Sequence, residues 1–285
     1  MTLMMDTREY IFVKRKVLNL TGVDLNCYKT PQVQRRLRTY LVRSGYPSWH
    51  HFFRAVSGDP SAVSHLKDYL TINVSAFFRD TEKFEYLQQS ILPELLRATS
   101  ARSPQLRVWS AGCSHGHEPY SLAMMLAEVS GFYRKHYIQA TDIDRSALER
   151  AKSGGPYTAE EVAQVPPPLL ERYFRHSTAG PTHTDVARPD GYYVVESLRR
   201  KITFRYHNLL TASFGSGNGG GGFDLIVCRN VVIYFTAEVK NRLYKRFHDA
   251  LRPGGILFVG GAEVVFQASD LGFETAGISF YRRKK

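Results

Sequence analysis

The sequence predicts an α/β protein with a doubly wound, mostly parallel sheet, a small all-α N-terminal domain and a small antiparallel β insertion. Three observations support this prediction. Strand-like and helix-like segments alternate from Arg107 onward, a glycine turn follows the first strand, and residues 1–85 are helical in pattern and strongly basic. The expected strands are 107–111, 136–141, 202–206, 223–228 and 256–261, and the expected helices are 119–130, 145–152 and 236–251.

Composition divides the chain into three parts. Residues 1–85 form the helical domain, residues 86–104 a linker helix and loop ending at the polar stretch 100–104, and residues 105–285 the sheet domain. The connection 153–201 is too long for an ordinary crossover. Its YYVV segment and its turn signals at 179–181 and 189–191 predict a small antiparallel β-subdomain at about 171–201. The glycine-rich stretch SFGSGNGGGGFD precedes a strand and is expected to be a surface loop.

The stretch RVWSAGCSHGHEPYSLAMML, residues 107–126, predicts a turn that binds a nucleoside cofactor. Gly112 and Gly116 bracket the turn and Pro119 opens the helix, so the backbone can approach a ligand closely. The G-x-x-x-G spacing differs from the G-x-G-x-x-G dinucleotide fingerprint, which argues against a pyrophosphate. A nucleoside with a charged tail fits better, with Glu118 facing a cation and Asp142 facing the ribose. A plain strand-to-helix turn would also explain the glycine pair alone.

Residues 30–45 predict a basic helix. Thr30 is the expected N-cap and Pro31 the first helical residue, Leu37 and Leu41 form the apolar side, and Gly45 ends the helix. A solvated charged face or a surface for an acidic helical partner would both explain its charge. The helix carries four arginines with no acid from 31 to 43: Arg35, Arg36, Arg38 and Arg43.

The overall charge and the cysteines limit the function classes. A formal net charge of +12 indicates an acidic partner, without choosing among nucleic acid, membrane surface and acidic protein. The sequence has no apolar run of membrane-spanning length and no signal-peptide pattern at its start, which predicts a cytoplasmic protein. Cys27, Cys113 and Cys228 lack paired spacing, and His115 and His117 lack accompanying ligands, so we expect neither disulfides nor a metal site.

The string SAGCSHGHEPYSLAMML resembles the S-adenosylmethionine motif of the bacterial chemotaxis receptor glutamate O-methyltransferases, the CheR family. NVSAFFRD, ATDID, HNLL, FDLIVCRNVVIYF and LRPGGILFVGGAE resemble further blocks of this family in the same order, and the resemblance covers about residues 15–282. It implies a seven-stranded methyltransferase sheet with an antiparallel last strand. It also implies S-adenosylmethionine as cofactor, S-adenosylhomocysteine as product, and methylation of receptor glutamates for sensory adaptation.

The resemblance assigns roles to individual residues. Tyr234 would lie nearest the transferred methyl group, with Arg79 opposite, either orienting the incoming carboxylate or holding the methionine carboxylate. Arg229 could instead be ion-paired at its strand end, and His117 stands where the family usually has glutamate. By pattern alone, the polar residues of NVSAFFRD also fit a turn that caps the next helix. The implied cofactor-binding set is Asn73, Ser75, Arg79, Gly112, Glu118, Asp142, Asn208, Leu209, Arg229 and Asn230.

The implied partner is the cytoplasmic helical region of a methyl-accepting chemotaxis receptor, met by the arginine helix, with the enzyme at the membrane only through that receptor. The β-subdomain could bind the receptor's C-terminal peptide as an added strand, although its loop is longer and more polar than expected. Two alternatives remain. The same cofactor could serve another acceptor, but CRNVVIYF replaces the N/D-P-P-Y-type motif, so no nucleic acid is expected. A catalytically silent signalling scaffold is disfavoured by the intact polar residues.

Overall fold

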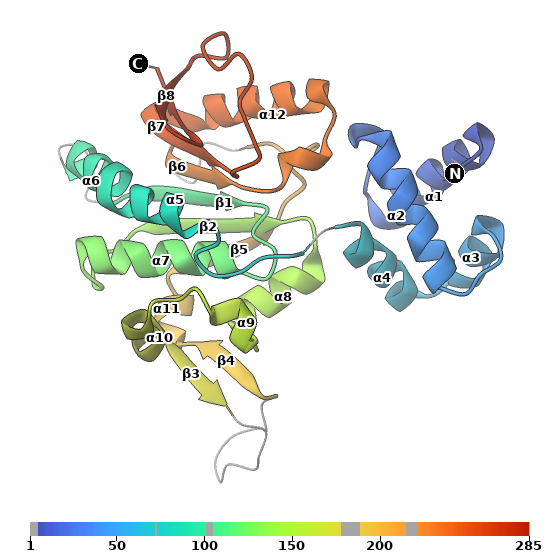
Figure 1. Cartoon of the computed structure of the whole chain (residues 1–285), viewed down its shortest axis with the longest axis horizontal. Helices are drawn as coiled ribbons and strands as arrows, with labels where there is room; N and C mark the ends of the chain where they lie inside the picture. The colour runs from blue at the N-terminus through green and yellow to red at the C-terminus, as the bar shows by residue number, and fades with distance from the viewer. Residues whose placement is uncertain (1–4, 72, 101–104, 178–188, 215–221, 285) are drawn as a thin grey trace. The chain divides into compact units, whose positions relative to one another are not determined.

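The structure, a computed structural model, describes residues 5–71, 73–100, 105–177, 189–214 and 222–284. Contacts between residues divide the chain into two compact units (Figure 1). The helical unit comprises residues 1–73 and 232–240, and the sheet unit comprises residues 74–231 and 241–285. This division precedes the expected boundary at residue 85, because the aromatic residues after Asn73 pack in the core of the sheet unit. Most of the polar stretch 100–104 lies outside the described residues.

The described part of the helical unit is almost entirely helical. Its α-helices are α1 (Thr7–Thr21), α2 (Thr30–Arg43), α3 (Trp49–Val56) and α4 (Pro60–Leu70), with the 3-10 turns η1 (Leu25–Cys27) and η3 (Val232–Tyr234). Thr30 is the first residue of α2 rather than its N-cap, which is Lys29. Helical geometry therefore begins one residue earlier than expected. The N–H of Lys29 donates to the Tyr234 carbonyl at 2.9 Å. Val13, Leu37 and Leu66 are fully buried in this unit.

The sheet unit contains a seven-stranded sheet in the order β5-β2-β1-β6-β7-β9-β8. The last strand, β9 (Phe280–Arg283), runs antiparallel to β7 and to the edge strand β8 (Phe273–Gly277). The predicted fold class, a mostly parallel seven-stranded sheet with an antiparallel last strand and a small helical domain, is therefore confirmed. The parallel strands are β1 (Arg107–Ala111), β2 (Tyr137–Asp142), β5 (Ile202–Tyr206), β6 (Phe223–Cys228) and β7 (Leu251–Val259).

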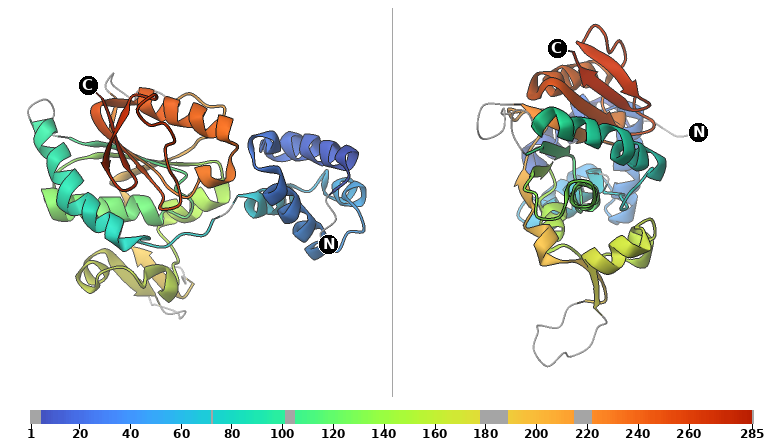
Figure 2. Two further views of the ribbon diagram at one scale, coloured as in Figure 1. Left: turned by 45° about the horizontal axis from the view of Figure 1, so that its top comes forward. Right: turned by 90° about the vertical axis from the view of Figure 1, so that its left-hand side faces the viewer.

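Helices cover both faces of the sheet (Figure 1). Helices α7 (His117–Ser130) and α8 (Arg145–Ser153) lie on one face and α12 (Ala237–Ala250) on the other, because the strand order reverses between β1 and β6 and the crossovers are right-handed. Helix α7 begins two residues before Pro119, since the left-handed Gly116 already ends the turn. A continuous run of α5 (Thr81–Tyr86), the π-helical η2 (Leu87–Ile91) and α6 (Leu92–Ser100) follows NVSAFFRD, and its α6 part contacts α7 (Figure 2).

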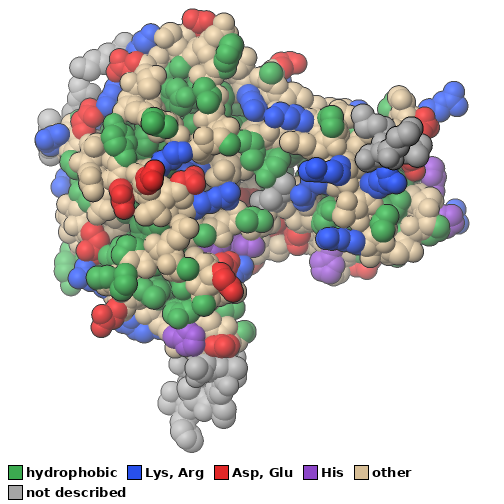
Figure 3. Space-filling model, viewed as in Figure 1, with side chains coloured by type: hydrophobic (Ala, Val, Ile, Leu, Met, Phe, Trp, Pro, Cys, Tyr) green, Lys and Arg blue, Asp and Glu red, His purple; other side chains and the backbone are tan. Residues whose placement is uncertain are grey.

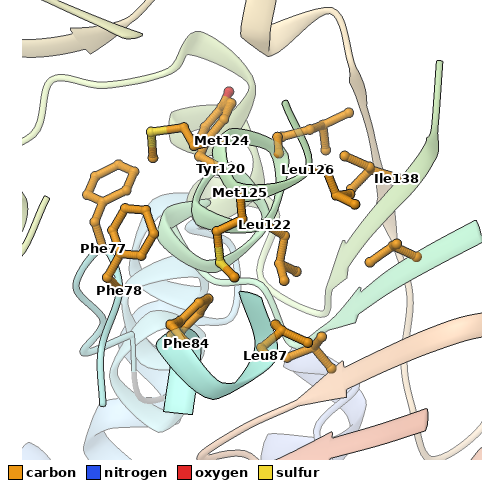
Figure 4. Close-up of a cluster of buried hydrophobic side chains, with 14 of the residues drawn as sticks. Phe77, Phe78, Phe84, Leu87, Tyr120, Leu122, Met124, Met125, Leu126 and Ile138 are labelled. Atoms are coloured by element: carbon orange, nitrogen blue, oxygen red, sulfur yellow. The ribbon is translucent and has the colours of Figure 1, made fainter. Parts of the chain in front are cut away.

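The main core of the sheet unit surrounds α7. Phe77, Phe78 and Phe84, which follow the chain's entry into this unit, belong to one buried cluster with Leu122 and Met125 of α7 (Figure 4). Each of these five side chains is at most 6% exposed. Burial of large apolar side chains contributes about 1.5–3 kcal/mol each. This packing fixes NVSAFFRD against the helix that carries Glu118.

The insertion between β2 and β5 contains a two-stranded antiparallel sheet, β3 (Phe174–Ser177) and β4 (Gly191–Val194). Three short helices that the sequence analysis did not identify accompany it: α9 (Ala159–Val162), α10 (Pro167–Tyr173) and α11 (Glu196–Arg199). The run of prolines made α10 difficult to predict from the sequence, although a proline is well tolerated at a helix start. The predicted turn at 179–181 and the centre of the glycine-rich stretch lie outside the described residues.

Candidate active site

The carboxyl ends of β1, β2 and β6 bring the predicted glycine turn and two carboxylates to one edge of the sheet. Strand β1 is the point where the strand order reverses, with β2 on one side and β6 on the other. Ligands of open α/β sheets bind in the crevice outside such a point. Gly112 follows β1, Asp142 ends β2 and Arg229 follows β6.

Gly112 has a backbone conformation and surroundings that exclude a side chain. Its φ is +87°, in the region that favours glycine. A Cβ built there would lie 2.5 Å from Cγ2 of Val231. The backbone N–H of Gly112 donates to the Thr141 carbonyl at 2.8 Å, which ties the turn to β2. The turn therefore has no room for a side chain at Gly112.

Glu118 lies in the first turn of α7, and its carboxylate is largely buried. Oε1 accepts a hydrogen bond from the Ser110 hydroxyl at 2.7 Å, and Oε2 lies 3.6 Å from the Arg229 guanidinium. Burial raises the pKa of Glu118, and Arg229 and Ser110 partly oppose this rise. A buried carboxylate whose charge is only partly balanced is suited to an ammonium group.

Asp142 ends β2, where its carboxylate organises the neighbouring backbone. Oδ2 accepts from the Ser114 N–H at 2.7 Å and Oδ1 accepts from the Asp144 N–H at 2.9 Å. Burial raises the pKa of Asp142, and these backbone N–H donors oppose the rise. Each carboxylate oxygen can accept more than one hydrogen bond, so lone pairs remain for hydroxyl donors.

Asn208 and Leu209 follow β5 and are tied to the Asp142 strand end. The N–H of His207 donates to the Asp142 carbonyl at 2.9 Å. The Asn208 side-chain oxygen accepts from the Leu210 N–H at 2.9 Å, and Leu209 is buried. The turn thus presents an amide and an apolar side chain next to Asp142.

NVSAFFRD and the loop after β6 bring four more predicted residues to the sheet unit. The Arg79 guanidinium donates to the Val74 carbonyl at 2.8 Å. Asn230 has a left-handed φ of 59°, and its N–H donates to the Glu263 carboxylate at 2.9 Å. The Arg229 side chain is 3% exposed and is held at 2.6 Å by the Asp80 carboxylate, so the ion-paired alternative raised by the sequence describes it. Ser75 is half-buried in the same segment.

The remaining predicted residues belong to the helical unit. Tyr234 lies in η3 and, through its carbonyl, holds Lys29. Arg36 differs from the other helix arginines, because its guanidinium donates to the Tyr69 carbonyl and stacks 4.9 Å from the Tyr69 ring. Arg35, Arg38 and Arg43 are exposed, as is Asn73 in part. Figure 3 shows lysine and arginine side chains gathered over these helices.

The sequence analysis missed several residues that shape the site. Ser110 orients Glu118, and Glu263 accepts from the N–H groups of Asn230 and Gly260, at 2.9 and 2.7 Å. Ser110 is the one polar residue in the apolar end of β1, two residues before Gly112, and this is a usable signal. The GGAE block contained Glu263, but its backbone partner Asn230 in the loop after β6 lies 33 residues away, and no local pattern gives that pairing.

The glycine turn and the helix that follows it contribute two histidines to a polar cluster. Ligand atoms of His115, His117 and Glu161 lie within 4.8 Å of one another, a spacing a metal ion could use. The Arg150 guanidinium contacts His115 Nδ1 at 3.2 Å and Glu161 Oε2 at 2.7 Å and so supplies positive charge there. Burial and Arg150 lower the pKa of His115 to about 4. We assign no metal to this cluster, because a guanidinium already neutralises its carboxylate.

Comparison with known proteins identifies the family. The family description "CheR methyltransferase, SAM binding domain" matches residues 73–280, and "CheR methyltransferase, all-alpha domain" matches residues 8–71. This chain belongs to the CheR methyltransferase family. It is similar to the chemotaxis protein methyltransferase of Listeria monocytogenes, with 38% identity over 275 residues that cover 96% of this chain and 97% of the relative. It is also similar to chemotaxis protein methyltransferase 2 of Pseudomonas aeruginosa, with 37% identity over 91% of this chain and 87% of the relative.

This CheR-family chain is an S-adenosylmethionine-dependent methyltransferase. The residues fit that cofactor, because the Gly112 turn and the buried carboxylates of Glu118 and Asp142, which would suit an ammonium and hydroxyl donors, stand at one sheet edge. None of the helices among the described residues is long and apolar enough to cross a membrane.

Proposed function

We propose that this CheR-family enzyme methylates glutamate side chains in the cytoplasmic helical region of a methyl-accepting chemotaxis receptor, forming methyl esters for sensory adaptation. The proposal is supported by the chemotaxis protein methyltransferase relatives and by the placement of Glu118 and Asp142 at the sheet edge that carries the Gly112 turn. That donor set suits the methionine ammonium and the ribose hydroxyls. The enzyme would act in the cytoplasm and reach the membrane only through the receptor.

The chemistry requires positioning more than acid–base catalysis. S-adenosylmethionine supplies a methyl group activated by a positively charged sulfur. A glutamate acceptor is already ionised near neutral pH, so no general base is needed. Holding the acceptor carboxylate in line and excluding water can contribute about 7 kcal/mol or more. We assign this positioning to Arg79 and Tyr234, with Arg79 binding a carboxylate, either that of the acceptor or that of the methionine.

The proposed receptor surface is the exposed side of α2. Arg35, Arg38 and Arg43 would meet acidic receptor helices, and Arg36 would support that face from its place on Tyr69. The proposed second contact is the strand pair β3–β4, to which a receptor C-terminal peptide could add a strand. Both contacts are proposals about the acceptor rather than the chemistry.

The test is transfer of labelled methyl groups from S-adenosylmethionine to membranes that contain one methyl-accepting receptor. We expect label on the receptor that is released by mild base, because esters are base-labile. Asp142→Asn should remove most of the labelling. Glu149→Gln, an exposed site on α8 of the same unit, is the matched control and should label normally.

Two outcomes would contradict the proposal. Base-stable label would indicate an acceptor other than a carboxylate. Absence of any label on receptor membranes, with S-adenosylhomocysteine bound normally in calorimetry, would move the activity to a different acceptor protein.

A further inference from the structure

Arg229 occupies an unusual place for an arginine beside a cofactor site. Nη2 donates to two acceptors of one turn, the Arg79 carbonyl and the Asp80 carboxylate, each at 2.6 Å. Nη1 lies 3.6 Å from Glu118. The guanidinium also lies 5.0 Å from the Phe84 ring centre and 4.8 Å from that of Phe258. With the side chain 3% exposed, its orientation is fixed from several sides.

The turn that Arg229 holds has strained backbone geometry. Phe78 and Asp80 flank Arg79 with φ values of 51° and 62°, and Asn230, next to Arg229, has φ of 59°. Such conformations of non-glycine residues are strained and persist only where surrounding contacts enforce them. Here those contacts are specific. The Phe78 N–H donates to the Ser121 hydroxyl at 3.0 Å, and Arg229 binds the other side of the same turn.

We propose that the Arg229 side chain is a positioning group, which fixes the Phe78–Asp80 turn and thereby aims Arg79, rather than a ligand of the cofactor. The buried Arg229 guanidinium also contacts Glu118. It therefore links Arg79, the proposed carboxylate-binding residue, to Glu118, the proposed ammonium-binding residue. This inference rests on the proposed function only for the role of Arg79. The mechanical part, that Arg229 holds the turn, is independent of the acceptor.

The first measurement is hydrogen exchange of the full-length protein, followed at the Phe77 and Phe78 amides. In wild type these amides donate to the Glu161 carbonyl and the Ser121 hydroxyl. Arg229→Gln should speed their exchange at least tenfold. The matched control is Arg252→Gln, which removes another arginine that pairs with a buried aspartate, Asp224, at the opposite end of β6. Arg252→Gln should leave the exchange rates of these two amides unchanged.

The second measurement is a double-mutant cycle read by methyl transfer. If Arg229 acts through Arg79, Arg229→Gln should lower kcat/KM at least tenfold in wild type and less than threefold in an Arg79→Ala background. Arg252→Gln should have the same small effect in both backgrounds. Asp80→Asn, a change at a partly exposed carboxylate, repeats the test if Arg229→Gln does not fold.

The outcomes separate this inference from the proposed function. Unchanged exchange at Phe77 and Phe78 in both Arg229→Gln and Asp80→Asn would overturn it, whatever the acceptor is. Full additivity of the Arg229 and Arg79 effects would overturn it as well. If the wild-type protein did not methylate the receptor, only the proposed function would be contradicted. The hydrogen-exchange result would still decide whether Arg229 holds the turn.

Discussion

The imidazole Nε2 of His117 lies 3.0 Å from Oε1 of Glu161, and the His117 side chain is completely buried. This contact joins the first turn of α7 to α9 of the insertion. The rings of Phe77 and Tyr157, each 4.9 Å from the imidazole, enclose it. Burial lowers the pKa of His117, against the opposing effect of Glu161, so His117 is a packed, neutral partner of the insertion.

We predict that His117→Glu destabilises the protein. The new carboxylate would face Glu161 in a buried position, and two like charges there should lower the free energy of unfolding by about 2 kcal/mol. Adding Glu161→Gln should recover most of the loss in urea unfolding. If His117 also influences the cofactor, the dissociation constant of His117→Glu should differ modestly from wild type between pH 5.5 and 8. Identical constants across that range would restrict His117 to stability.

We predict that stability falls as the pH falls from 7.5 to 5.5. Histidine in the unfolded chain has a pKa near 6.5, whereas burial and Arg150 lower the pKa of native His115 to about 4. Below pH 6.5 the unfolded state therefore binds more protons, and His115 alone should account for about 1 kcal/mol at pH 5.5. His115→Gln should reduce this slope in urea unfolding, and an unchanged slope would contradict the assignment. His136, whose pKa burial also lowers to about 4, offers an independent repeat.

We predict that Glu118→Gln weakens S-adenosylhomocysteine binding at least tenfold, since a charge-assisted hydrogen bond contributes about 1.5–3 kcal/mol. Burial raises the pKa of Glu118 and Glu263 adds to the rise, while Arg229 and Ser110 oppose it. Wild-type affinity should therefore decline as the pH falls from 7 to 5, because protonation removes the carboxylate charge. Calorimetry should show this decline in wild type and a flat profile in Glu118→Gln. A decline of equal size in both proteins would assign it to another group.

We predict that Gly112→Ala lowers stability by about 2 kcal/mol or more and abolishes cofactor binding. The substitution combines a left-handed φ with a 2.5 Å approach to Val231 Cγ2. Gly131→Ala separates these causes, because Gly131 has φ of +90° with no atom within 4 Å of the added Cβ. The control should lose about 1 kcal/mol and bind S-adenosylhomocysteine normally. Addition of Val231→Ala to Gly112→Ala should restore part of the lost stability.

We predict that substitutions of two neighbouring arginines of α2 have different effects on receptor binding and stability. Arg35→Ala should weaken receptor binding severalfold, with a shallower salt dependence than wild type, and should leave stability within about 0.5 kcal/mol. Arg36→Ala should lower stability by about 1 kcal/mol, because it removes the contact with Tyr69. Sedimentation with receptor membranes at two salt concentrations, alongside urea unfolding, would measure both effects. Equal stability losses would show that the two side chains are equivalent.

Local patterns predicted the sheet and the glycine turn because each depends on nearby residues. The alternation of strands and helices predicts the parallel sheet, and Gly112 follows β1, Glu118 lies in the first turn of α7 and Asp142 ends β2. Pairings between distant residues were beyond reach. Asp80 and Arg229 are 149 residues apart, and His117 meets Glu161 through an insertion whose short helices have little pattern of their own.

Arginine roles were the least predictable, since one residue type serves different tasks here. Arg36 and Arg35 are adjacent in sequence, but only Arg36 folds onto Tyr69. Arg229 was predicted beside the cofactor, but the strand end that places it there also buries its guanidinium between two aromatic rings. Burial and hydrogen-bond partners decide these roles, and neither is encoded in the charge pattern.

The segment 232–240 has a consequence for how this enzyme can be divided. Although it follows β6, it belongs to the helical unit, where Tyr234 and Thr236 make backbone hydrogen bonds to Lys29 and Cys27. A chimera in which only the N-terminal region is replaced by that of a relative would pair segment 232–240 with a foreign N-terminal region and could lose these hydrogen bonds. If α2 contacts the receptor as proposed, receptor specificity and the Tyr234 phenol would therefore be inherited together.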